Sequence, residues 1–115
     1  MPVYNEKGTI REIVARVLAS PVEKEVIIVD DFSKDGTREI LQELAAADSR
    51  IRLFFHEKNK GKGAAIQTAL PNVAGTIVII QDADLEYCPE DYPALIDPIV
   101  KGYADVVYGT RFIGP

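Results

Sequence analysis

Residues 25–55, EVIIVDDFSKDGTREILQELAAADSRIRLFF, decide the fold of this chain. The β-branched run at 25–29 and the apolar run at 51–55 each predict a strand. Between them, aliphatic residues recur at helical spacing, so residues 37–47 are expected to form a helix. A strand, a helix and a strand in this order predict a parallel βαβ unit.

The same alternation extends on both sides of this unit. Further helices are expected at 9–19, 61–70 and 90–100, strands at 76–80 and 104–108, and the end of a strand at 2–4. The pattern predicts an α/β fold with a mainly parallel sheet and helices on both of its faces. Because no repeat or linker interrupts it, residues 1–115 are interpreted as a single domain.

Composition excludes several classes of protein. An apolar fraction of 47% supports a packed core. The formal charge, 13 − 18 = −5, argues against nucleic acid as a partner, since phosphate backbones are bound by clustered basic residues. No apolar run approaches the roughly 18–20 residues of a membrane span. The lone cysteine, Cys88, cannot form an internal disulfide, which is consistent with a reducing, cytoplasmic location.

Ligands of parallel α/β sheets bind at the carboxyl ends of the strands, where this chain has polar segments. QDADLE, residues 81–86, directly follows the apolar run at 76–80. In extended backbone Asp82 and Asp84 point to the same side. Two hard oxygen ligands suit Mg²⁺ or Mn²⁺, which would screen a diphosphate leaving group. The alternative is a pair of solvated turn aspartates.

A second acidic segment, VDDFSKDGT, follows the strand expected at 25–29. The carboxylates of Asp30 and Asp31 can accept hydrogen bonds from a nucleobase or from ribose hydroxyls. The alternative is structural, because Asp35 and Gly36 are typical of a turn that leads into a capped helix. That alternative accounts for part of the segment but not for the tandem aspartates.

Weaker signals stand at other strand ends. The loop NKGKG, residues 59–63, can offer backbone N–H groups and positive charge to phosphates, or it is merely a flexible loop. Glu6 either caps the following helix or faces a ligand. Arg111 can pair with phosphate or form a surface salt bridge. His56 has no serine or cysteine nucleophile grouped with it and is interpreted as a structural or a surface residue.

Together these segments carry a family resemblance. They are PVYNE (2–6), EVIIVDDFSKDGT (25–37), NKGKGAA (59–65), QDADLEYCPEDY (81–92) and ADVVYGTRF (104–112). In this order they resemble the family 2 glycosyltransferases, and within them the dolichol-phosphate mannosyltransferase-like group. The resemblance implies a GT-A fold, whose Rossmann-like half binds a nucleotide-sugar.

The resemblance also implies roles for individual residues. The nucleoside would be bound by Pro2, Tyr4, Glu6 and Asp31, with Asp30 nearby, and by Gly61 and Lys62 closing over the base or ribose. The divalent metal and the donor diphosphate would be bound by Asp82 and Asp84, with Glu86 as a further metal ligand at a position where relatives often have glutamine. Arg111 would face a phosphate of the donor or the acceptor. The catalytic residues that the resemblance implies are Asp82, Asp84 and Arg111.

The implied reaction is an inverting transfer of a sugar from GDP-mannose or a UDP-sugar to an acceptor, polyprenyl or dolichyl phosphate in this group. The phosphate oxygen of such an acceptor is already ionised near neutral pH. It therefore needs alignment and charge screening rather than a general base. A lipid acceptor would bring the protein to the membrane surface.

Two alternatives remain at this point. Asp30, Asp31, Asp82 and Thr110 also fit a phosphoacceptor receiver domain, although such a domain needs nothing like residues 2–6 before its acidic strand. The chain can also be an inactive nucleotide-binding fragment. In the family's sheet the strand before PVYNE is central, so we expect a donor-binding half cut at both ends that is poorly stable or inactive alone.

Overall fold

The computed structural model of the chain describes residues 1–86 and 88–104. Its helices and strands, in chain order, are β1 (Pro2–Val3), α1 (Ile10–Ala19), β2 (Val26–Asp30), α2 (Thr37–Ala47), β3 (Ile51–Phe55), α3 (Lys62–Ala69) and α4 (Tyr92–Val100), with 3₁₀ turns at Leu70–Asn72 and Pro89–Asp91. The alternation expected through residue 55 is confirmed, as are the two later helices with shorter bounds. The strand expected at 104–108 lies, apart from Ala104, outside the described residues.

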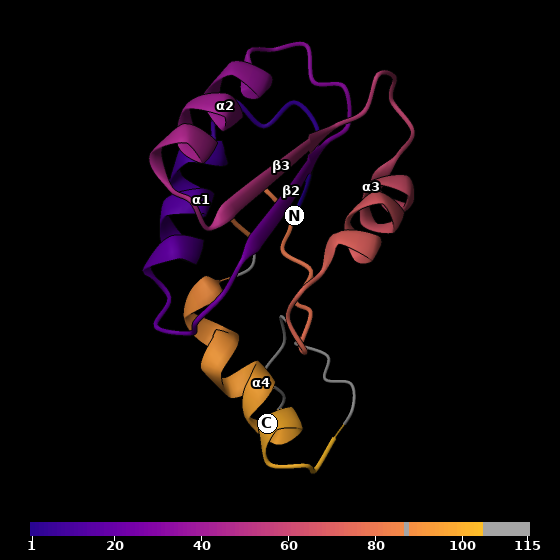
Figure 1. Ribbon diagram of the computed structural model, residues 1–115. Helices are drawn as coiled ribbons and strands as arrows, with labels where there is room; N and C mark the ends of the chain where they lie inside the picture. The colour runs from indigo at the N-terminus through magenta and orange to yellow at the C-terminus, as the bar shows by residue number, and fades with distance from the viewer. Residues whose placement is uncertain (87, 105–115) are drawn as a thin grey trace.

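The sheet is parallel, in the order β1-β2-β3. Val3 is in register with Asp30, which is in turn in register with Phe55. In Figure 1, α1 and α2 lie on one face of the sheet and α3 lies on the other, as the sequence predicts. The three carboxyl ends therefore meet at one edge, and the segments that follow β1, β2 and β3 lie there together.

The core lies between α1, α2 and the sheet. The inward face of α1 consists of Ile10, Ile13, Val14 and Val17, none of them more than 4% exposed. They belong to one cluster with Val3 and Ile28 of the sheet and with Leu41 of α2. Each fully buried aliphatic side chain contributes about 1.5–3 kcal/mol relative to exposure, so this face anchors the edge of the sheet on which the polar segments stand.

The strand expected at 76–80 is wrong for this structure. Residues 76–80 do not pair with the sheet, and Val78 and Ile80 are about half exposed. A strand needs a neighbouring backbone ladder, and β1 offers only Pro2–Val3. An apolar hollow of about 540 Å³ lies between residues 76–81 and β2. Within the described residues β1 pairs with β2 alone and lies at the edge of the sheet.

Candidate functional site

A pocket of about 290 Å³ opens at the carboxyl edge of the sheet. We call it the strand-end pocket, and it is lined by Pro2, Val3, Tyr4, Glu6, Asp31, Lys62, Ala65, Asp82, Ala83 and Asp84. Most of the residues implicated by the sequence are among them. The larger hollow beside β2 is mainly lined by aliphatic side chains and contains none of these carboxylates. The strand-end pocket is therefore the candidate functional site.

The turn after β1 is tied to the turn after β2. The Asn5 N–H donates to Ser33 Oγ over 2.9 Å, and the Lys34 N–H donates to Asn5 Oδ1 over 2.8 Å. Glu6 lies between the start of α1 and the strand-end pocket. Its carbonyl accepts the N–H groups of Thr9 and Ile10 at the start of α1, and its side chain lines the strand-end pocket.

Asp31 is buried and lines the strand-end pocket, and its carboxylate already accepts hydrogen bonds from the chain. Its Oδ1 accepts the N–H of Lys60, and its Oδ2 accepts the N–H of Gly61, each over 2.8 Å. Burial opposes ionisation of Asp31, but these bonds and that of His56 outweigh it and hold its pKa below the usual value. Asp31 is thus an ionised side chain that fixes the loop after β3.

His56 is the residue that the sequence left without a function. It directly follows β3, its side chain is 5% exposed, and its Nδ1 lies 2.8 Å from Asp31 Oδ1. Its Nε2 lies 2.8 Å from the hydroxyl oxygen of Thr68 on α3. The prediction that His56 has a structural role is confirmed, and the alternative that it lies at the surface is wrong. Its position after a strand is the sequence signal that could have linked it to the site.

Asp30, which the resemblance puts near the nucleoside, does not line the strand-end pocket. The side chain is fully buried, its Oδ2 accepts the Ser33 N–H over 3.1 Å, and Arg38 Nε lies 3.4 Å from the same oxygen. Successive residues of extended backbone point in opposite directions, so the tandem aspartates cannot both face one ligand. Asp30 stabilises the turn after β2.

The glycine-rich loop brings a positive charge to the strand-end pocket. Gly61 precedes α3 with a φ of +94°, a conformation that favours glycine, although Gly61 does not itself line the pocket. Lys62 follows, and its Nζ lies 2.6 Å from Asp82 Oδ1. The loop after β3 thereby contacts the acidic segment that follows residue 80.

Asp82 and Asp84 both line the strand-end pocket, as their spacing predicts. Asp84 also has the turn character considered for it, since its Oδ1 accepts the Glu86 N–H over 3.1 Å. Glu86 is exposed and does not line the pocket. Arg111 lies outside the described residues.

Two hydrogen bonds, one part-buried and one buried, position the acidic segment. The hydroxyl of Thr9 donates to the carbonyl of Ala83 over 2.9 Å, and the hydroxyl of Tyr92 donates to Gln81 Oε1 over 2.6 Å. Burial raises the pKa of Tyr92 to about 12, so this hydroxyl remains a donor at neutral pH. The segment is therefore tied to α1 on one side and to the start of α4 on the other.

The carboxylates of the strand-end pocket suit a metal ion whose remaining ligands come from a bound substrate. Among residues 1–86 and 88–104, no group of three or more acidic, cysteine or histidine side chains is arranged to hold a metal alone. Mg²⁺ commonly binds one or two carboxylates and completes its coordination with water and substrate phosphates. Asp82 and Asp84, which both line the strand-end pocket, supply two carboxylates that suit that arrangement.

Comparison with known proteins identifies the family. The model of glycosyl transferase family 2 matches residues 1–115. The chain belongs to glycosyl transferase family 2. It is 37% identical over 116 residues to the undecaprenyl-phosphate 4-deoxy-4-formamido-L-arabinose transferase of Pseudomonas fluorescens (strain SBW25), covering 96% of this chain and 34% of that protein. The protein of the same name from Aeromonas hydrophila is 37% identical over 112 residues, covering 93% and 34%.

A solved structure shares the fold of this family 2 chain. It is the mannosyltransferase PcManGT from Pyrobaculum calidifontis in complex with GDP-Man and Mn²⁺, with a TM-score of 0.67 and 33% sequence identity. The match covers 72% of this chain and 26% of that one. The expected GT-A fold class is thus confirmed. The family 2 chain spans about a third of the length of the curated relatives it matches.

Proposed function

We propose that this chain is the donor-binding part of a metal-dependent, inverting glycosyltransferase that moves a sugar from a nucleotide-sugar to polyprenyl phosphate. The observation that supports this most is the strand-end pocket, where Asp82 and Asp84 lie with Lys62 and Asp31 in a family 2 chain. The names of the relatives include undecaprenyl phosphate, and the similar structure contains GDP-Man and Mn²⁺.

The donor would lie across the strand-end pocket. Its nucleoside would contact Pro2, Tyr4 and Glu6 on one wall and the loop held by Asp31 on the other. Its diphosphate would lie toward Asp82 and Asp84, with Lys62 beside it. Lys62 supports this orientation, because its ammonium is on the side of Asp82 and would add positive charge next to the phosphates.

A divalent cation bound there would screen the diphosphate and stabilise it as a leaving group. Asp82 and Asp84 would hold the cation together with donor phosphate oxygens, and either Mg²⁺ or Mn²⁺ suits these hard oxygen ligands. Glu86 would contribute only weakly, because its side chain is exposed and does not line the strand-end pocket.

With a phosphate acceptor, this chain would need to align the reactants but would not need to supply a general base. A phosphate monoester has its second pKa near 6, so its oxygen is an ionised nucleophile at neutral pH. Direct displacement at the anomeric carbon would then need no protein base, and Arg111 would screen a phosphate of donor or acceptor.

In the part of the chain that the structure describes, no helix has the length and apolar content to cross a bilayer. We place the reaction at the membrane surface, where polyprenyl phosphate is available.

Calorimetric titration of the chain with GDP-mannose and with UDP-glucose, each with and without Mn²⁺, tests this function. We expect one donor to bind in a metal-dependent way and Asp82→Ala to abolish that binding. The receiver alternative predicts instead that acetyl phosphate phosphorylates an aspartate while neither nucleotide binds. Metal-independent binding that Asp82→Ala leaves unchanged contradicts the assignment of the acidic segment.

A further inference from the structure

The buried imidazole of His56 joins two parts of the chain that flank the strand-end pocket. Its Nδ1 contacts Asp31 Oδ1, and its Nε2 contacts the hydroxyl of Thr68 on α3, each at 2.8 Å. Because an ionised carboxylate only accepts hydrogen bonds, Nδ1 is the nitrogen that donates to Asp31. The orientation of the ring is therefore set from both sides.

Asp31 passes this constraint to the loop after β3. The same Oδ1 that faces His56 accepts the Lys60 N–H, and Oδ2 accepts the Gly61 N–H. Both donors are backbone groups, so the carboxylate fixes the path of the main chain and not merely a side chain. Charge-assisted bonds of this kind are about twice as strong as neutral ones.

The backbone held by Asp31, Lys60–Gly61, is followed directly by Lys62, which lines the strand-end pocket. Gly61 leads directly into Lys62, whose Nζ lies 2.6 Å from Asp82 Oδ1. A change in the backbone at Lys60 or Gly61 would move the start of α3 and with it the Lys62 ammonium. Displacements of about 1 Å at groups that position a substrate can cost large factors in binding or rate.

We propose that His56 is a positioning residue of the donor site, which through Asp31 holds the Lys60–Gly61 backbone so that Lys62 stands against the acidic segment. This inference rests on the proposed function for the identity of the ligand. His56 itself touches no donor, since it is buried behind Asp31 and is absent from the lining of the strand-end pocket.

Two substitutions separate this role from simple packing. In His56→Asn, the side-chain amide nitrogen can replace Nδ1 and donate to Asp31, whereas His56→Phe fills the space and offers no donor. Thr68→Val removes the contact to Nε2 and leaves the imidazole in place. Leu41→Ala, a core lesion on α2, is the matched control for a loss of stability without a lesion in this network.

The experiment measures two quantities on the whole chain and its variants. NMR hydrogen exchange reports the protection of the Lys60 and Gly61 amides, and calorimetry with Mn²⁺ reports the affinity for GDP and for UDP. We expect His56→Phe to speed exchange of both amides about tenfold and to weaken nucleotide binding about as much, the effect of losing one charge-assisted bond. His56→Asn should restore most of both, and Thr68→Val should fall between. Leu41→Ala should lower the melting temperature without a selective change at these amides.

The outcomes distinguish the two claims. If the wild type binds neither nucleotide, the proposed function fails, while selective loss of amide protection in His56→Phe still upholds the fixing of the loop by His56. If the wild type binds and both His56→Phe and Thr68→Val match it in exchange and affinity, the inference alone is overturned. If His56→Phe does not fold, His56→Asn and Thr68→Val decide by the same two measurements.

Discussion

Lys62 Nζ lies 2.6 Å from Asp82 Oδ1, so a lysine at the start of α3 is paired with the first aspartate of the acidic segment. The Lys62 side chain is 57% exposed. An exposed pair of this kind is screened by water and salt and contributes little to stability. The pair matters for metal binding instead, because the Lys62 ammonium contacts the Asp82 oxygen that a divalent cation would need as a ligand.

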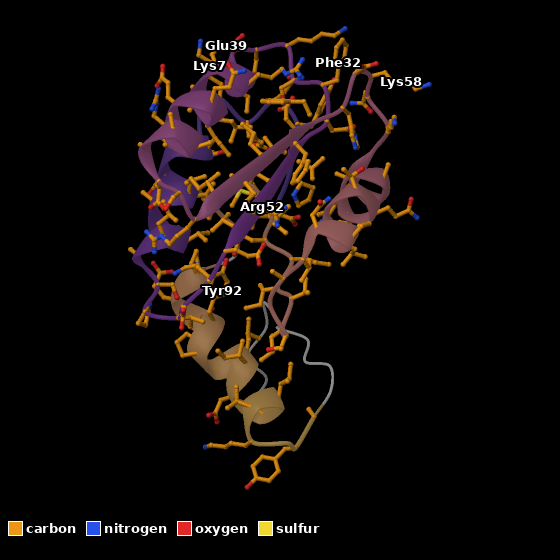
Figure 2. The ribbon with its side chains drawn as sticks, in the orientation of Figure 1. Lys7, Phe32, Glu39, Arg52, Lys58 and Tyr92 are labelled. Carbon is orange, nitrogen blue, oxygen red and sulfur yellow. The ribbon has the colours of Figure 1, made fainter. Side chains whose placement is uncertain are left out.

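Lys62→Met should therefore raise the affinity of the chain for Mn²⁺ alone, since the cation no longer competes with the ammonium for Asp82. An exposed pair is worth about 0.2–1 kcal/mol, which corresponds to roughly a 1.4-fold to fivefold change. Lys58→Met is the control, because Lys58 lies on the same loop, is exposed and points outward in Figure 2. Mn²⁺ titration followed by electron paramagnetic resonance measures the change, and equal affinities in all three proteins would contradict the competition.

Asp84 and Glu86 should differ in their effect on the metal. Asp84→Asn removes a pocket carboxylate and should weaken Mn²⁺-dependent nucleotide binding by about tenfold or more, the effect of losing one contact to a charged group. Glu86→Gln alters an exposed side chain outside the pocket lining and should leave that affinity within about twofold. Calorimetry with GDP and Mn²⁺ compares them. A stronger loss in Glu86→Gln than in Asp84→Asn would reverse the assignment.

The ionised state of Asp31 predicts a pH dependence of folding. Its pKa lies below the ordinary value of 3.8 in the folded chain, so its contribution to stability is complete above that value and is lost as the pH falls through the folded pKa. The free energy of unfolding of the wild type should exceed that of Asp31→Asn by a gap that is constant near neutral pH and shrinks below about pH 4. Urea denaturation across this range measures the gap. A gap that persists undiminished down to about pH 2 contradicts the prediction.

Local sequence patterns were sufficient for the elements between residues 9 and 55. The helix expected at 37–47 and the strand expected at 51–55 have those bounds in the structure, because helical periodicity indicates the first and a short apolar run indicates the second. Residues 76–80 show the limit. An apolar run indicates an extended, buried segment, but strand pairing depends on a neighbouring backbone that the run itself does not reveal.

The site residues were predictable where acidic residues follow an apolar run in the sequence, and less so where their contacts join distant parts of the chain. Asp82 and Asp84 share the strand-end pocket as their spacing predicts. Alternation separates Asp30 from Asp31, but the sequence does not say which of them faces the pocket. His56 was left without a function because its partners, Asp31 and Thr68, are 25 and 12 residues away in the chain.

The central claim is that Asp82 belongs to a joint site for metal and nucleoside diphosphate. Its most direct test is the dissociation constant of GDP, and in parallel of UDP, measured by calorimetry with and without Mn²⁺ for the wild type and for Asp82→Asn. We expect Mn²⁺ to tighten binding of one of these nucleotides at least about tenfold in the wild type, a coupling of about 1.4 kcal/mol, and to have no such effect in the variant. Equal coupling in the two proteins, or none in the wild type, would contradict it.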